Sequence, residues 1–315
     1  MFVGFSLVCE LLVILTQYIV GSYFPELLTS PVFSGLFIYL SSLIPLYCVA
    51  LPIFIFMTKP LPKVVPHKEK MGFLGWLGGL CIAELAMMTG NYISNILLVI
   101  IESALNTTTQ NPVAEATEQS NVWITIIFMC IIAPLLEELF FRKIVCDRLL
   151  VLGEGYAVFV SSVLFGLIHR NFYQFAYAFF LGLLFSFIYV KTGKIRYSAI
   201  YHMILNFFGG VVTPYLVEQL QIERLINMLE TGVFDYDLRL LIFMGITLAY
   251  EGIMMIAGIV GIVLLIKAKH DKSLRLDSGI LPPPKKHRVA NIFCTVGVAA
   301  AITYFTVFFV LSLSM

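Results

Sequence analysis

Charged residues are scarce in this chain. Asp, Glu, Lys and Arg make up 12% of its 315 residues, whereas they make up about 25% of soluble domains. With 60% hydrophobic residues, a soluble fold of this length would lack the polar surface needed to cover itself. The composition therefore excludes a soluble enzyme, a disulfide-stapled secreted domain and a disordered chain. The net charge of +1 gives no indication of nucleic-acid binding.

The spacings that identify a zinc site or a redox pair are also absent. None of the six cysteines belongs to a CxxC pair, and no HExxH sequence occurs. Five cysteines lie inside apolar stretches, and Cys146 lies near the end of the fourth stretch. We therefore expect small buried thiols rather than disulfides.

Apolar sequence in long runs is what the chain has in abundance. A helix needs about 20 apolar residues to span the hydrocarbon core of a bilayer, and the fifth of the stretches found here is short for a full crossing. The pattern predicts an all-α polytopic membrane bundle of eight or nine transmembrane helices. The nine apolar stretches are 5–21, 33–57, 72–101, 122–150, 156–169, 172–190, 198–216, 240–266 and 291–313.

The links between the stretches alternate in charge. Seventeen of the 20 Lys and Arg residues lie in the links 59–70, 142–148, 191–196 and 267–288, and the intervening links are acidic. Basic links face the cytoplasm in most membrane proteins. We therefore predict a multi-pass protein of the cell membrane with its N-terminus in the cytoplasm.

Ionisable side chains within the apolar stretches are hypotheses for a functional site, because a charge near the bilayer centre is costly. We favour structural roles for three of them, Glu10, Glu84 and Glu251, with lining of a cavity as the alternative. The complete set is Glu10, Glu84, Glu137, Glu138, His169, His202 and Glu251.

Glu137 and Glu138 are adjacent, so on a helix their side chains point about 100° apart. Glu138 and Arg142 are four residues apart and share a face, which predicts a buried structural ion pair. Glu137 has no cation nearby in the sequence, which suits a reactive carboxylate. The alternative is that both carboxylates belong to one structural network.

His202 and Asn206 are also one helical turn apart, and His169 follows Phe165 by one turn. In a hydrolase, Glu137 assisted by His169 would activate water, and His202 with Asn206 would donate hydrogen bonds to an oxyanion. Alternatively, Glu137, His169 and His202 could be zinc ligands with an open fourth position, or the set could relay protons in a transporter.

Three motifs occur in order at these residues: Glu137-Glu138-x-x-x-Arg142, Phe165-x-x-x-His169 and His202-x-x-x-Asn206. They resemble the motifs of the CPBP family, also called Abi, which contains CAAX prenyl endopeptidases and bacteriocin-processing or immunity proteins. The resemblance covers residues 122–213. It implies an intramembrane glutamic endopeptidase in which Glu137 and His169 activate water, and His202 and Asn206 form the oxyanion hole.

This resemblance suggests three regions: transmembrane helices over 1–121, a catalytic core over 122–217, and an extracellular amphipathic segment with the last helices over 218–315. It implies a membrane-associated protein or peptide as substrate and no cofactor, with zinc possible if the family's metalloprotease description holds. A non-catalytic immunity or scaffold protein is the other alternative. The four site residues should converge on a cavity that opens towards the cytoplasmic half of the bilayer.

Overall fold

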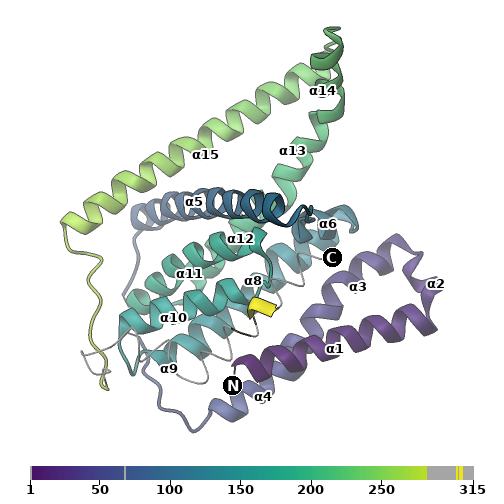
Figure 1. Cartoon of the computed structure of the whole chain (residues 1–315). Helices are drawn as coiled ribbons and strands as arrows, with labels where there is room; N and C mark the ends of the chain where they lie inside the picture. The colour runs from purple at the N-terminus through teal and green to yellow at the C-terminus, as the bar shows by residue number, and fades with distance from the viewer. Residues whose placement is uncertain (1, 67–68, 282–302, 304, 308–315) are drawn as a thin grey trace.

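The computed structural model describes residues 2–66, 69–281, 303 and 305–307. Every named element in this part of the chain is a helix, which confirms the predicted all-α membrane bundle (Figure 1). Two shorter apolar helices, Leu7–Tyr23 and Glu154–Leu167, accompany the long ones. The ninth predicted stretch, 291–313, lies outside the described residues apart from 303 and 305–307. Within the described residues, six helices are long and apolar enough to cross a membrane: Pro31–Thr58, Phe73–Leu105, Val122–Leu149, Phe172–Thr192, Ile195–Thr231 and Leu238–His270.

The first part of the chain forms a group of helices beside the rest of the bundle (Figure 1). The hydroxyl of Ser30 caps the crossing Pro31–Thr58 by accepting the Phe33 N–H, with Pro31 in the first turn. A π-helical segment, Ile44–Ala50, interrupts this crossing and packs against the first helix. The elements are α1 (Phe2–Tyr23), α2 (Pro25–Leu28), α3 (Pro31–Leu43) and α4 (Leu51–Thr58).

The crossing Val122–Leu149 carries the two adjacent glutamates and changes its hydrogen-bond pattern twice. Pro134 has no N–H to donate, and the turn before it is π-helical, with Ala133 N–H bonded to Phe128 C=O. Glu137 and Glu138 follow in a short α-helical turn. The segments are α7 (Val122–Thr125), π-helix Ile126–Ile132, α8 (Ala133–Glu138), π-helix Leu139–Cys146 and α9 (Asp147–Leu149).

The remaining helices begin and end at recognisable signals. Asn171 caps α11 by accepting the Gln174 N–H, and Gly193 ends that helix at a φ of 64°. The elements are α5 (Phe73–Leu105), α6 (Pro112–Glu118), α10 (Glu154–Leu167), α11 (Phe172–Thr192), α12 (Ile195–Phe207), π-helix Phe208–Val212, α13 (Thr213–Gln219), α14 (Ile222–Thr231) and α15 (Leu238–His270).

Helix α11 lies at the centre of the bundle, between α5 and α10. Gly90 of α5 meets the backbone of Tyr177 so closely that an added Cβ would lie 2.1 Å from its Cα. Gly261 of α15 meets Cys81 of α5 in the same way, with 2.5 Å between an added Cβ and the Cys81 carbonyl oxygen. Small residues at such crossings let membrane helices pack closely.

The four basic links lie together at one end of the bundle. Val64 donates to the Asp147 carbonyl at 2.8 Å, and Lys191 pairs with Glu154 at 2.5 Å. Leu281 of the last described link donates to the Val151 carbonyl at 2.9 Å. Helix α5 starts beside this end, and its 33 residues carry the chain about 50 Å to the link that contains Glu115 and Glu118. The charge pattern of the sequence thus matches two ends of the fold, while the cytoplasmic orientation stays a prediction.

Candidate active site

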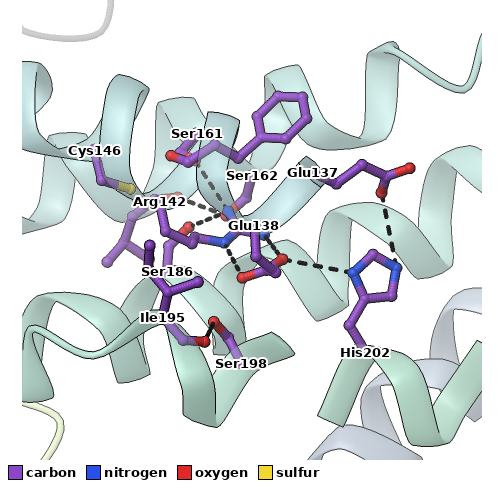
Figure 2. A network of polar contacts seen from close by, with 12 residues as sticks. Glu137, Glu138, Arg142, Cys146, Ser161, Ser162, Ser186, Ile195, Ser198 and His202 are labelled. Atoms are coloured by element: carbon purple, nitrogen blue, oxygen red, sulfur yellow. Dashed lines mark hydrogen bonds and ion pairs between the residues drawn. The ribbon is translucent and has the colours of Figure 1, made fainter. Parts of the chain in front are cut away.

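Glu138 and Arg142 form a buried ion pair at the inner side of the site (Figure 2). The guanidinium contacts both carboxylate oxygens, with Nε 2.9 Å from Oε2 and Nη2 3.1 Å from Oε1. Its Nη1 donates to the hydroxyls of Ser161 at 3.0 Å and Ser186 at 2.8 Å. Both charged residues have 0% exposure. The pairing expected from the four-residue spacing is therefore present, and its hydrogen bonds offset the cost of burying two charges.

His202 lies between the two adjacent carboxylates. Its Nδ1 is 3.6 Å from Glu138 Oε1, and its Nε2 is 3.7 Å from Glu137 Oε2 (Figure 2). The side chain is 6% exposed, and the edge of Phe165 packs against its ring at 5.6 Å between centroids. Glu137 Oε2 and His202 Nδ1 are both buried without a hydrogen-bond partner among the described atoms. The imidazole thus has one nitrogen towards the structural pair and one towards Glu137.

His169 follows the end of α10 and its ring orientation is fixed by the backbone. The Nδ1 atom lies 2.9 Å from the carbonyl oxygen of Phe165. Because a carbonyl only accepts hydrogen bonds, Nδ1 must carry the hydrogen. In the neutral ring, Nε2 is then an acceptor. The motif spacing of four residues between Phe165 and His169 produces this contact.

Asn206 donates through Nδ2 to the carbonyl of Met129 at 2.9 Å. That carbonyl is available because Ala133 bonds to Phe128 instead, and Pro134, the next donor in a π-helical pattern, has no N–H. The side-chain amide has two hydrogens, so one holds Asn206 in place and the second can face a ligand. The sequence predicted a donor at Asn206, but it did not predict this anchor.

The four predicted catalytic residues line a single cavity of about 520 Å³. Glu84 and Glu251, for which we favoured structural roles, line the same cavity, and no ion pair joins either to a described cation. Three further residues, which the sequence pattern did not indicate, line it from the first turns of α11: Tyr173, Gln174 and Tyr177. Their spacing after the capping Asn171 was the available signal, but an apolar stretch rich in aromatics concealed it. The predicted site members in the wall are Glu137, His169, His202 and Asn206.

The cavity extends towards the acidic end of the bundle, which differs from our expectation of an opening on the cytoplasmic half. Asn111 and Val113, from the link that also carries Glu115 and Glu118, line it, and no described lining residue comes from the basic links. The physical reason for this direction is the buried Glu138–Arg142 pair and its surroundings. Arg142 and Tyr189, each with 0% exposure, fill the space between His202 and the basic end.

Glu10 is separate from the cavity wall. Its carboxylate forms an ion pair with Arg170, the residue that follows His169. Thus, of the three additional glutamates in apolar stretches, two line the cavity, and the third is paired with a cation next to a predicted catalytic residue.

A zinc site does not fit the donors that the structure brings together. Among the described residues, no three His, Cys, Asp or Glu side chains are arranged to hold a metal ion. His169 already uses Nδ1 for the Phe165 carbonyl. The hypothesis that Glu137, His169 and His202 are zinc ligands therefore has no support from the geometry. The expectation of no cofactor remains untested.

Residues 119–208 match the family model of the type II CAAX prenyl endopeptidases, Rce1-like. This part of the chain is similar to that family. The resemblance inferred from the three motifs is thereby confirmed, and the Rce1-like segment contains all four predicted catalytic residues together with Glu138 and Arg142. No solved structure matches the chain.

Two curated relatives are each similar to part of the chain. One is the UPF0177 protein YxdF of Lactococcus lactis, 29% identical over 43% of this chain and 74% of YxdF. The other is the membrane-embedded CAAX protease MroQ of Staphylococcus aureus, 38% identical over 36% of this chain and 47% of MroQ. The chain thus spans less than half the length of MroQ, the relative named as a protease.

Proposed function

We propose that the protein is an intramembrane endopeptidase that hydrolyses a peptide bond of a membrane-associated protein or peptide. One observation carries the proposal: the Glu137 carboxylate has a buried oxygen without a hydrogen-bond partner, beside His202, in a cavity that His169 also lines. A carboxylate oxygen without a hydrogen-bond partner at membrane depth is costly for structure alone. The Rce1-like segment and the similarity to MroQ support the same reading.

In this proposal Glu137 is the general base. It takes a proton from a water molecule while the water oxygen attacks the carbonyl carbon of the scissile bond. His169 Nε2 accepts the second hydrogen of that water and so orients it. The tetrahedral intermediate then collapses, the C–N bond breaks, and Glu137 returns its proton to the leaving amine. The products are a carboxylic acid and an amine, and no covalent enzyme intermediate forms.

His202 and Asn206 stabilise the negative oxygen of the intermediate. His202 donates from Nε2, and the free amide hydrogen of Asn206 donates from the adjacent turn of α12. Both donors are held before the substrate arrives, His202 beside Glu138 and Asn206 by the Met129 carbonyl. Such preorganisation is what makes an oxyanion hole effective, because the donors do not have to reorient during the reaction.

A peptidase assay on the detergent-purified protein tests the proposal. A mixture of quenched fluorescent peptides and membrane-anchored peptides is incubated with the wild type, with Glu137→Gln and with Glu118→Gln. Glu118 is exposed on α6, so its variant is the matched control for losing one carboxylate. Cleavage by the wild type and Glu118→Gln, but not by Glu137→Gln, is the expected result. Equal cleavage by Glu137→Gln would contradict the proposal.

The same assay separates the glutamate mechanism from the zinc alternative. After prolonged dialysis against a chelator, the wild type should keep its activity, because Glu137 and His169 activate the water. Loss of activity that added Zn²⁺ restores would instead make His202 a ligand and remove it from the oxyanion hole.

A further inference from the structure

The first helix reaches the active site through one charged contact. Glu10 is the one charged residue of α1, and its carboxylate pairs with Arg170. Both side chains are largely removed from solvent, with exposures of 20% for Glu10 and 33% for Arg170. Helix α1 lies outside the Rce1-like segment 119–208, so this contact joins a separate part of the chain to the site.

Arg170 occupies a strained position in the turn between α10 and α11. Its φ is 56°, in the left-handed region that residues with a Cβ rarely adopt. The residues on either side are tied to each other, since Asn171 Nδ2 donates to the His169 carbonyl at 2.7 Å. A strained residue of this kind persists only where its surroundings hold it in place. The Glu10 carboxylate is one such restraint.

Helix α1 is itself held firmly enough to act as a support. Cys9, next to Glu10, is 8% exposed and belongs to the same core cluster as Phe141 and Phe165. Phe165 is the residue whose carbonyl accepts from His169 Nδ1. Glu10 and the backbone partner of His169 are therefore fixed to one packed core, and the ion pair closes the connection through Arg170.

We propose that Glu10 is a positioning residue that acts through Arg170 to hold the His169 imidazole in its catalytic orientation. The inference rests on the proposed function, because it assigns a role to a part of the chain that supports the same site. Glu10 touches no reacting atom. It holds the turn 168–171, and the turn sets the direction in which His169 Nε2 points.

Steady-state kinetics of Glu10→Gln tests the proposal, with Glu26→Gln as the matched control. Glu26 lies exposed on α2, the next helix along the chain. A small misplacement of a catalytic group lowers the rate by up to about a hundredfold. Because Glu10→Gln should misplace His169, we expect it to lower kcat by about tenfold to a hundredfold, with KM unchanged. Glu26→Gln should behave as the wild type.

The charge-exchanged double variant, Glu10→Arg with Arg170→Glu, distinguishes the ion pair from other effects of the single change. It should recover kcat towards the wild-type value, whereas Arg170→Glu alone should be as slow as Glu10→Gln or slower. A Glu10→Gln protein that loses thermal stability but keeps kcat would overturn the proposal, because Glu10 would then support only the fold.

A second readout does not depend on turnover. Nitrogen-15 labelling of the five histidines gives ring signals, and the signal missing from His169→Gln identifies His169. Glu10→Gln should broaden or shift the His169 Nδ1–H signal, while Glu26→Gln leaves it unchanged. An unaltered signal would overturn the positioning role. If the wild type cleaves nothing but the signal responds to Glu10→Gln, the proposed function fails and the positioning of His169 stands.

Discussion

Glu137 and Glu138 are neighbours in the chain, but the fold surrounds them in opposite ways. The Glu138 side is closed: Arg142 contacts both of its oxygens, and two serine hydroxyls bind the guanidinium. The Glu137 side is open: the carboxylate lines the cavity, and its Oε2 has no hydrogen-bond partner. His202 lies between the two sides.

The difference shows how a membrane protein can hold a reactive carboxylate beside a stable one. A buried charge that is fully paired and hydrogen-bonded gives a fixed structure, whereas one without a hydrogen-bond partner keeps its capacity to react with a ligand. Because adjacent helical residues point about 100° apart, one turn of α8 supplies both. The closed side then serves as a rigid base that holds His202 towards the open side.

Substitutions on the closed side should reduce the stability of the fold the most. Arg142→Ala leaves the Glu138 charge buried and unpaired, and we expect it to reduce the free energy of unfolding by about 3–5 kcal/mol. Thermal unfolding in detergent measures this. Arg224→Ala removes an exposed pair with Asp237 and is the control, with little change expected. Equal effects of the two substitutions would mean that the buried pair contributes no more than a surface pair.

Substitutions on the open side should lower the catalytic activity. Asn206→Ala removes a proposed oxyanion donor, so kcat should fall by about 10²–10³ with KM nearly unchanged. Asn227→Ala, on the exposed face of α14, is the control. A higher KM at constant kcat would show that Asn206 binds the ground state of the substrate rather than its transition state.

Much of the fold and of the candidate site could be predicted from the sequence. The length of the apolar stretches gives the helices, and the four-residue spacings give the Glu138–Arg142 pair and the shared face of His202 and Asn206. The Asn206–Met129 contact could not be predicted, because it depends on the π-helical turn before Pro134. The Glu10–Arg170 pair joins residues far apart in the chain, which no local periodicity reveals. The direction in which the cavity extends could not be predicted, because the position of His202 near the start of α12 does not show what fills the space beside it.

Cysteine labelling tests the direction of the cavity. Lys63→Cys in a basic link and Glu115→Cys on α6 should react with a membrane-impermeant thiol reagent from opposite sides. Thr213→Cys, in the cavity wall, should react from the same side as Glu115→Cys. Reaction from the Lys63 side would place the opening at the basic end, as the sequence predicted. The cysteine-substituted chains are compared with the unsubstituted protein to subtract native thiols.

The smallest effect is expected far from both sides, at the start of α15. Asp237 caps this helix by accepting the Leu240 N–H, and the hydrogen bond from Arg224 lowers the pKa of its carboxyl. Because the folded pKa is lowered, the contribution to stability is present above the ordinary Asp value of about 3.9 and is lost as the pH falls below it. Asp237→Ala should lower Tm slightly at neutral pH, no longer do so in acid, and leave kcat unchanged.

The central claim is that one carboxylate reacts and its neighbour supports the structure. Parallel measurement of kcat and Tm for Glu137→Gln and Glu138→Gln tests it most directly, since the two substitutions are chemically identical and one residue apart. The account predicts that Glu137→Gln abolishes turnover and keeps the wild-type Tm, whereas Glu138→Gln lowers Tm markedly. A stable but inactive Glu138→Gln protein together with an unfolded Glu137→Gln protein would reverse the two roles.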